Sequence, residues 1–133
     1  MHKIIISYIV SFGLLLLVGF SAHQSIMDYL GKSLDFSLLH SYLFHAVFSC
    51  AICTSLLTLS KLPQFRAQLG FIYLGGLLLK LLAFAGIFQD IVLRENPIST
   101  ASSVSLLVPI ALFLSLEVYF IAKLLRRIDT KFK

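Results

Sequence analysis

The chain has 133 residues, of which 59% are hydrophobic and 13% are charged. Soluble domains carry about 25% charged residues, so this composition excludes an ordinary soluble protein and predicts one that has lipid as its solvent. The net charge of +5 could also suit a nucleic-acid-binding protein. No aromatic-basic surface accompanies the basic C-terminal tail, however, and we expect no nucleic-acid partner.

Four long apolar runs organise the sequence. A bilayer core of about 30 Å needs about 20 apolar residues in a helix, and a helix satisfies its own backbone hydrogen bonds where no water is available. We therefore predict an all-α fold, a single four-helix transmembrane domain over residues 1–133. Its helices are expected at residues 4–22, 38–60, 69–93 and 104–125.

The connections between these helices are short. Apolar residues recur at helical spacing within 23–37 and predict a short interfacial helix there. Residues 61–68 predict a tight turn, and the Ser/Thr cluster in 94–103 predicts a loop. The first apolar run could also be a signal peptide, but Phe20 suits a cleavage site poorly, and we expect a retained helix.

Lysine and arginine predict the orientation, because cytoplasmic segments are enriched in them. The side with the two termini carries eight, and the opposite side carries only Lys32 and Arg94. We therefore predict both termini in the cytoplasm. The tail residues Lys123, Arg126 and Arg127 are also expected to contact phospholipid headgroups. The eight are Lys3, Lys61, Arg66, Lys123, Arg126, Arg127, Lys131 and Lys133.

Lys80 and Glu117 are charged residues that fall inside the predicted spans. Burying a charge near the bilayer centre costs about 2.5–3.5 kcal/mol on insertion scales, so such residues usually face a partner. Lys80 lies near the middle of the third predicted helix, and Glu117 lies in the fourth. Side chains lean toward the N-terminus of their own helix. Because these two helices run in opposite directions, the head groups converge in depth, and we predict an ion pair. The pair could have the purely structural role of fixing the helix register, or it could bind ions or a partner protein.

A second polar cluster is predicted nearer the outer surface. Asp90, toward the end of the third predicted helix, converges in depth with His45 of the second. His40 is a competing partner for Asp90, which could also simply reach interfacial water.

Small residues indicate where the helices pack. In the third helix a heptad stripe is expected to face the bundle or a partner, and bulky residues on the opposite side to face lipid. Ala46, Cys50 and Cys53 predict close packing of the second helix. The Cys-x-x-Cys spacing could also hold a metal with His45, but we expect no metal, no cofactor and no disulfide. The stripe is Gly76, Lys80, Ala83, Ile87 and Asp90, and the opposite side has Leu78, Leu82 and Phe88.

The segments LGFIYLGGLLLKLLAFAGIF and VPIALFLSLEVYFIAKLL resemble the ATP synthase protein I family. They look closest to a related group of uncharacterised bacterial four-helix membrane proteins, whose genes often lie beside those of the F-type ATP synthase. The matching features are Gly76-x-x-x-Lys80, Pro109 early in the fourth helix, where it would serve helix packing, and Glu117-x-Tyr119. The second helix departs from protein I, in which it is rich in Gly and contains Pro.

This resemblance implies a bacterial inner-membrane protein that helps to build the ATP synthase membrane sector, chiefly its rotor ring, or that supplies magnesium. Nothing in the sequence selects a reaction, because it contains no phosphate loop and no nucleophile with a base at a readable spacing, and we do not expect an enzyme. Three functions stay open: an accessory or assembly factor, a small proton or divalent-cation transport protein, and a structural subunit of another inner-membrane complex.

Overall fold

The structure is a computed structural model that describes residues 2–32, 37–89 and 100–132. Its long helices are α1 (His2–Leu30), α2 (Leu38–Leu59), α4 (Leu69–Ile87) and α6 (Thr100–Phe132), and the short helix α3 (Pro63–Arg66) lies between α2 and α4. No strand occurs in these three ranges. Four helices are long and apolar enough to cross a membrane. The predicted all-α architecture with four such helices is therefore confirmed.

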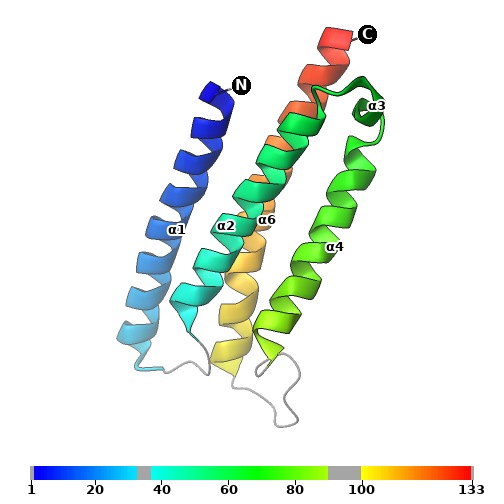
Figure 1. Ribbon diagram of the computed structural model, residues 1–133. Helices are drawn as coiled ribbons and strands as arrows, with labels where there is room; N and C mark the ends of the chain where they lie inside the picture. Colours follow the sequence, from blue (N-terminus) through cyan, green and yellow to red (C-terminus); the bar gives the residue numbers. More distant parts are fainter. Residues whose placement is uncertain (1, 33–36, 90–99, 133) are drawn as a thin grey trace.

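The helix α2 forms the centre of an up-and-down bundle. It packs against α1, α6 and α4, and Figure 1 shows both chain ends at the same end of the bundle as α3. In its most apolar stretch 44% of the residues of α2 are buried, against 17% in α4 and 11% in α1. The two outer helices therefore present most of their apolar surface to the surroundings, as expected where lipid is the solvent.

Aromatic rings fill the space between α1, α2 and α6. Phe12 lies edge-on to Phe120, with ring centroids 5.6 Å apart, and Tyr42 lies edge-on to Phe113 at 6.1 Å. These separations and orientations are the ones that aromatic quadrupoles favour. Close approach of α1 to α2 also requires a glycine, because a Cβ at Gly19 would lie 3.0 Å from the Tyr42 ring.

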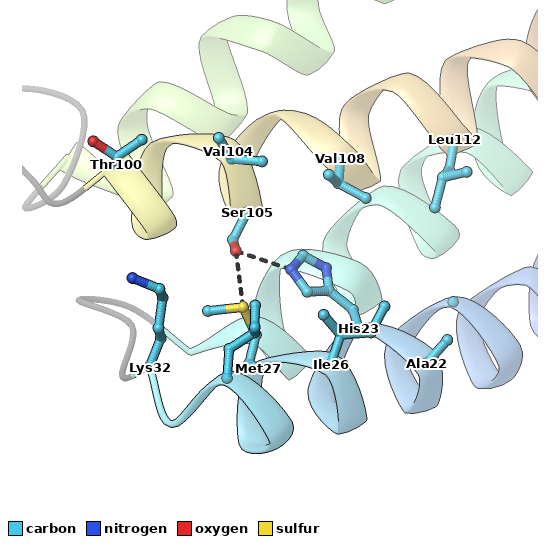
Figure 2. A pocket seen from close by; sticks show the side chains of 12 residues that line it. Ala22, His23, Ile26, Met27, Lys32, Thr100, Val104, Ser105, Val108 and Leu112 are labelled. Carbon is cyan, nitrogen blue, oxygen red and sulfur yellow. Dashed lines mark hydrogen bonds between the residues drawn. The ribbon is translucent and has the colours of Figure 1, made fainter.

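A buried histidine joins the same three helices at the other end of the bundle. Nδ1 of His23 lies 2.9 Å from the Tyr42 hydroxyl, and Nε2 lies 2.9 Å from Oγ of Ser105. The Ser105 hydroxyl in turn donates to the sulfur of Met27. His23 lines an apolar groove of about 490 Å³ between α1 and α6, and Figure 2 shows its side chain between the two helices, next to Ser105. An Nε2–H tautomer, with Tyr42 donating to Nδ1, satisfies every group in this chain of hydrogen bonds.

The first helix is longer than predicted. It continues to Leu30, so the separate interfacial helix predicted over 23–37 is wrong. The reason is that His23 and Met27 continue the buried face of α1 for two more turns. The helix stops where Gly31 adopts a φ of 66°, the left-handed conformation that commonly ends helices.

The third and fourth spans also differ from their predicted limits. α4 ends at Ile87, before the predicted 93, although residues 90–93 lie outside the described part of the chain. α6 begins at Thr100 and runs to Phe132, so the part of the predicted 94–103 loop that is described is helical. Ser102 and Ser105 are buried there. The Ser105 hydroxyl is satisfied by His23 and Met27 of α1, so it does not compete with helix formation.

The buried face of α4 differs in part from the predicted one. Ile87 was predicted to face the bundle and Phe88 to face lipid, whereas Ile87 is exposed and Phe88 is buried against Phe44. Toward the end of α4 the buried residues recur every four residues, at Lys80, Phe84 and Phe88, so the inward face follows this spacing and not the heptad stripe. Leu78 and Leu82 are exposed, as predicted.

Candidate functional site

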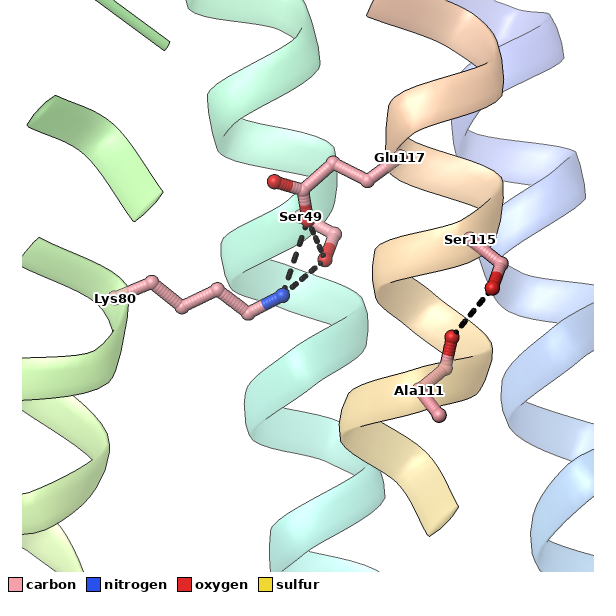
Figure 3. A network of polar contacts seen from close by, with 5 residues as sticks. All are labelled: Ser49, Lys80, Ala111, Ser115 and Glu117. Atoms are coloured by element: carbon pink, nitrogen blue, oxygen red, sulfur yellow. Dashed lines mark hydrogen bonds and ion pairs between the residues drawn. The ribbon is translucent and has the colours of Figure 1, made fainter. Parts of the chain in front are cut away.

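A buried ion pair lies at the centre of the bundle. Nζ of Lys80 is 3.0 Å from Oε2 of Glu117, and the exposed fractions of the two side chains are 3% and 0%. Figure 3 shows Lys80 extending from α4 across to α2 and α6. The ion pair is therefore present where the opposite directions of the two helices predicted it.

The third member of this cluster is Ser49 of α2, which sequence reasoning did not identify. Its hydroxyl donates to Oε2 of Glu117 at 2.7 Å and accepts from Nζ of Lys80 at 2.8 Å. The signal was available, because Ser41, His45 and Ser49 recur every four residues and share one face of α2. We call Lys80, Ser49 and Glu117 the central cluster.

Some hydrogen-bonding groups at the central cluster have no partner in the described part of the chain. Oε1 of Glu117 and the hydroxyl of Tyr73 are both buried and have no hydrogen-bond partner among the described residues, although Tyr73 lies beside the Glu117 carboxylate. A buried polar atom without a partner costs about 1–3 kcal/mol. The site can therefore accommodate a further donor, such as a water molecule or a group from a partner.

His45 lies one turn away from Ser49 in an aromatic environment. It is completely buried, its ring stacks on those of Phe84 at 5.3 Å and Phe113 at 6.2 Å, and neither ring nitrogen has a described hydrogen-bond partner. His40 is exposed. The predicted contact of either histidine with Asp90 lies outside the described residues.

The two cysteines of α2 occupy different environments. Both thiols are free, Cys53 buried and Cys50 half-buried. Within 2–32, 37–89 and 100–132, no three His, Cys, Asp or Glu side chains lie close enough together to hold a metal ion. Cys53 belongs to the buried hydrophobic cluster of the bundle, and Cys50 packs against that cluster, as the packing role predicts.

The other packing residues have unequal roles. Ala46 and Pro109 are buried, and Ala83 is half-buried. Gly76 faces Ile52 of α2, but a Cβ there would lie an ordinary 3.7 Å from it. The close approach that was predicted at Gly76 therefore occurs instead at Gly19, which the sequence did not single out.

The basic tail residues Lys123, Arg126 and Arg127 are exposed at the end of the bundle that holds both termini. They lie well away from the central cluster, since Arg127 follows Glu117 by almost three turns of helix. The predicted site residues therefore fall into two groups, a buried group at mid-bundle and an exposed basic group at one end.

Comparison with known proteins places the chain by family alone. No curated protein and no solved structure is significantly similar to it. The model of the family of unknown function (DUF6168) matches residues 1–128, which is almost the entire chain. The likeness to ATP synthase protein I stays a prediction. The chain belongs to the family of unknown function DUF6168.

Proposed function

We propose that this chain is a four-span inner-membrane protein, with both termini in the cytoplasm, that acts as an accessory factor in assembling the membrane sector of the F-type ATP synthase. In this role it holds rotor-ring hairpins within the bilayer. The proposal rests on the resemblance of residues 69–125 to protein I and its relatives, and on the geometry by which Lys80 attaches α4 to the rest of the bundle.

The distribution of basic residues supports the orientation. The end of the bundle with both termini and α3 carries Lys3, Lys61, Arg66, Lys123, Arg126 and Arg127 among the described residues. The opposite end has Lys32. Such asymmetry is typical of a bacterial membrane protein whose basic end stays in the cytoplasm.

The observation that carries the assembly role is the ion pair between α4 and α6. The main packing partner of α4 is α2, and Lys80 of α4 forms an ion pair with Glu117 of α6. The ammonium group of Lys80 can exchange Glu117 for another carboxylate at the same depth. An interdigitated apolar contact cannot change its partner in this way. Each rotor-ring subunit carries an acidic residue at mid-membrane, and we propose that it competes with Glu117 for Lys80.

The outer face of α4 provides the surface on which a hairpin would dock. Leu74, Leu78 and Leu82 are exposed there. Gly75 and Gly86 have open space where a Cβ would project. Small residues on an exposed face let a second transmembrane helix approach closely.

Paired substitutions separate this role from a purely structural one. Lys80→Met removes the ammonium group that the partner needs, so we expect the yield of intact rotor rings to fall to the level of a gene deletion. Glu117→Gln frees Lys80, so the amount of ring subunit that copurifies per folded molecule should equal or exceed that of the wild type. Equal losses with both variants would indicate that the pair only holds the fold. Normal ring yield in the deletion would contradict the assembly role.

Crosslinking locates the contact. A photoreactive group at Leu82, on the exposed face of α4, should capture a ring subunit. The same group at Leu14, which is comparably exposed on α1 (56% against 62%), is the matched control. Capture from both positions alike would indicate random collision in the membrane and would argue against a docking face on α4.

Cysteine accessibility tests the topology. Cys50 and Cys53 are first replaced by serine, and single cysteines are then placed at His2 and at Thr130. An impermeant maleimide should label both positions only after the cytoplasmic side is opened. Labelling of the two positions from opposite sides would require an odd number of spans.

Transport of protons or divalent cations is a second candidate, favoured by one observation. Ser41, His45, Tyr73 and Glu117 all carry buried polar atoms without a described hydrogen-bond partner, and a row of such groups could hold water within the bundle. Purified protein in liposomes should then collapse a proton or magnesium gradient faster than liposomes with His45→Phe. Equal leak rates would remove this candidate.

A further inference from the structure

The end of the bundle that holds both termini contains two adjoining basic hollows. The first, of about 170 Å³, lies between α1 and α6 and is lined in part by Lys3, Lys123 and Arg127. The second, of about 100 Å³, lies where α2 ends and is lined in part by Lys61, Arg66 and Arg127. Arg127 borders both hollows.

The remaining walls combine a hydroxyl group with apolar surface. Ser7 lines the first hollow, whereas Ile4 and Leu124 line both. A hydroxyl group and cations together suit an oxyanion. The shared apolar wall suits a ligand that continues into hydrocarbon.

Part of the second hollow is held rigidly. Nε of Arg66 donates to the carbonyl oxygen of Ser60 at 3.0 Å, and Nη2 of the same side chain reaches that of Lys61 at 3.4 Å. These bonds fix the guanidinium group at the C-terminus of α2, where helix carbonyls lack partners within the helix. A ligand would meet a cation that is already positioned, which lowers the entropy cost of binding.

The cations of the first hollow lack a counterion from the protein. Lys3, Lys123 and Arg127 form no ion pair with any carboxylate in the described ranges. Like charges gathered in one hollow repel one another, so their clustering points to an external anion.

Depth identifies the source of that anion. Arg127 follows Glu117 by ten residues of α6, about 15 Å along the helix axis. This distance is half of a bilayer core of about 30 Å. With the central cluster near mid-membrane, the backbone of Arg127 lies at the boundary between hydrocarbon and headgroups. Its long side chain can reach the lipid phosphates from there, at the depth where basic pockets between helices bind anionic headgroups.

We propose that the two basic hollows together bind the headgroup of one anionic phospholipid that carries two phosphates, a lipid of the cardiolipin type. One phosphate occupies each hollow, Arg127 contacts both, and the acyl chains continue along Ile4 and Leu124. This inference rests on the membrane topology proposed above but not on the assembly role.

Native mass spectrometry of the delipidated protein tests the site, with cardiolipin or phosphatidylglycerol added back at equal phosphate concentration. We expect one cardiolipin per chain, retained at least about tenfold better than phosphatidylglycerol, because the second phosphate binds at high effective concentration. Equal retention of the two lipids would overturn the two-hollow site. Displacement of cardiolipin by millimolar inorganic phosphate would assign the hollows to free phosphate and overturn it as well.

Two neighbouring arginines provide a matched pair of variants. Arg127→Gln should lower cardiolipin retention by about tenfold, because both phosphates lose a charge-assisted contact. Arg126→Gln makes the same change of charge one residue away, outside both hollows, and should change retention less than about twofold. Equal effects of the two variants would show that only general surface charge matters and would contradict the proposal.

The two hollows can be tested separately. Lys3→Gln and Lys61→Gln should each lower cardiolipin retention by about fivefold and leave the weaker binding of phosphatidylglycerol nearly unchanged, because that lipid can use the other hollow. An effect of only one of these substitutions would mean a single-phosphate site. If Arg127→Gln is poorly folded by thermal unfolding, Arg127→Lys keeps the charge but loses the bidentate fork. It should then give an intermediate loss, and full retention would overturn the role of Arg127.

Discussion

The coupling between Lys80 and Glu117 gives the most direct measure of how this bundle is held together. At a separation of 3.0 Å and an effective dielectric constant of about 20, the two charges attract each other by about 5.5 kcal/mol. Removing one partner leaves the other buried and uncompensated, which typically costs 3–5 kcal/mol, whereas replacing both is often nearly neutral. We therefore expect Lys80→Met and Glu117→Gln each to lower the free energy of unfolding by about 3–5 kcal/mol.

The double variant carries the test. Lys80→Met combined with Glu117→Gln should lie within about 2 kcal/mol of the wild type, so the coupling energy from the double-mutant cycle should reach about 3 kcal/mol or more. Because the chain has no tryptophan, unfolding is best followed by far-UV circular dichroism during a titration from mild detergent into sodium dodecyl sulfate.

A control and a refuting result complete this experiment. Ser115 is exposed, and its hydroxyl donates to the carbonyl oxygen of Ala111 in its own helix (Figure 3), so Ser115→Ala should change stability by less than about 0.5 kcal/mol. If each single variant loses less than about 1 kcal/mol, or if the double variant equals the sum of the singles, the two charges do not form a buried pair.

Further substitutions test the packing. Gly19→Val should destabilise the bundle by about 1–3 kcal/mol through overpacking. Gly76→Ala should be nearly neutral, because the added methyl group lies at an ordinary contact distance from Ile52. Thermal unfolding in detergent compares the two variants, and equal effects would contradict this account of α1–α2 packing. A maleimide should label half-buried Cys50 faster than buried Cys53, with masses read from the intact protein, and a disulfide in the unreduced protein would count against the packing role. His23→Leu should cost about 1–2 kcal/mol, because it leaves two buried hydroxyls without their partner; wild-type stability would mean that water replaces the ring.

Much of this architecture could be predicted from the sequence because hydropathy is a local property. The four apolar runs determine the four long helices, since a helix is the structure that satisfies its backbone without water. The depth of Lys80 and Glu117 was equally accessible, because helix rise and side-chain direction fix how far a group lies along the bundle axis. The predicted limits were less accurate. α1 continues to Leu30 because His23 and Met27 extend its buried face, and α6 begins at Thr100, before the predicted start.

What the tertiary structure alone decided is the rotation of each helix about its own axis. The depth of a residue in the bundle follows from its position in the chain. The direction in which its side chain faces depends on how the side chains of neighbouring helices interdigitate, which is a property of pairs of helices. Rotation brings Ser49 between Lys80 and Glu117, turns Phe88 inward rather than Ile87, and makes Gly19 rather than Gly76 the closest glycine contact. Apolar side chains are nearly interchangeable as neighbours of lipid, so hydropathy carries little information about which of them face inward, and only the packed bundle selects among them.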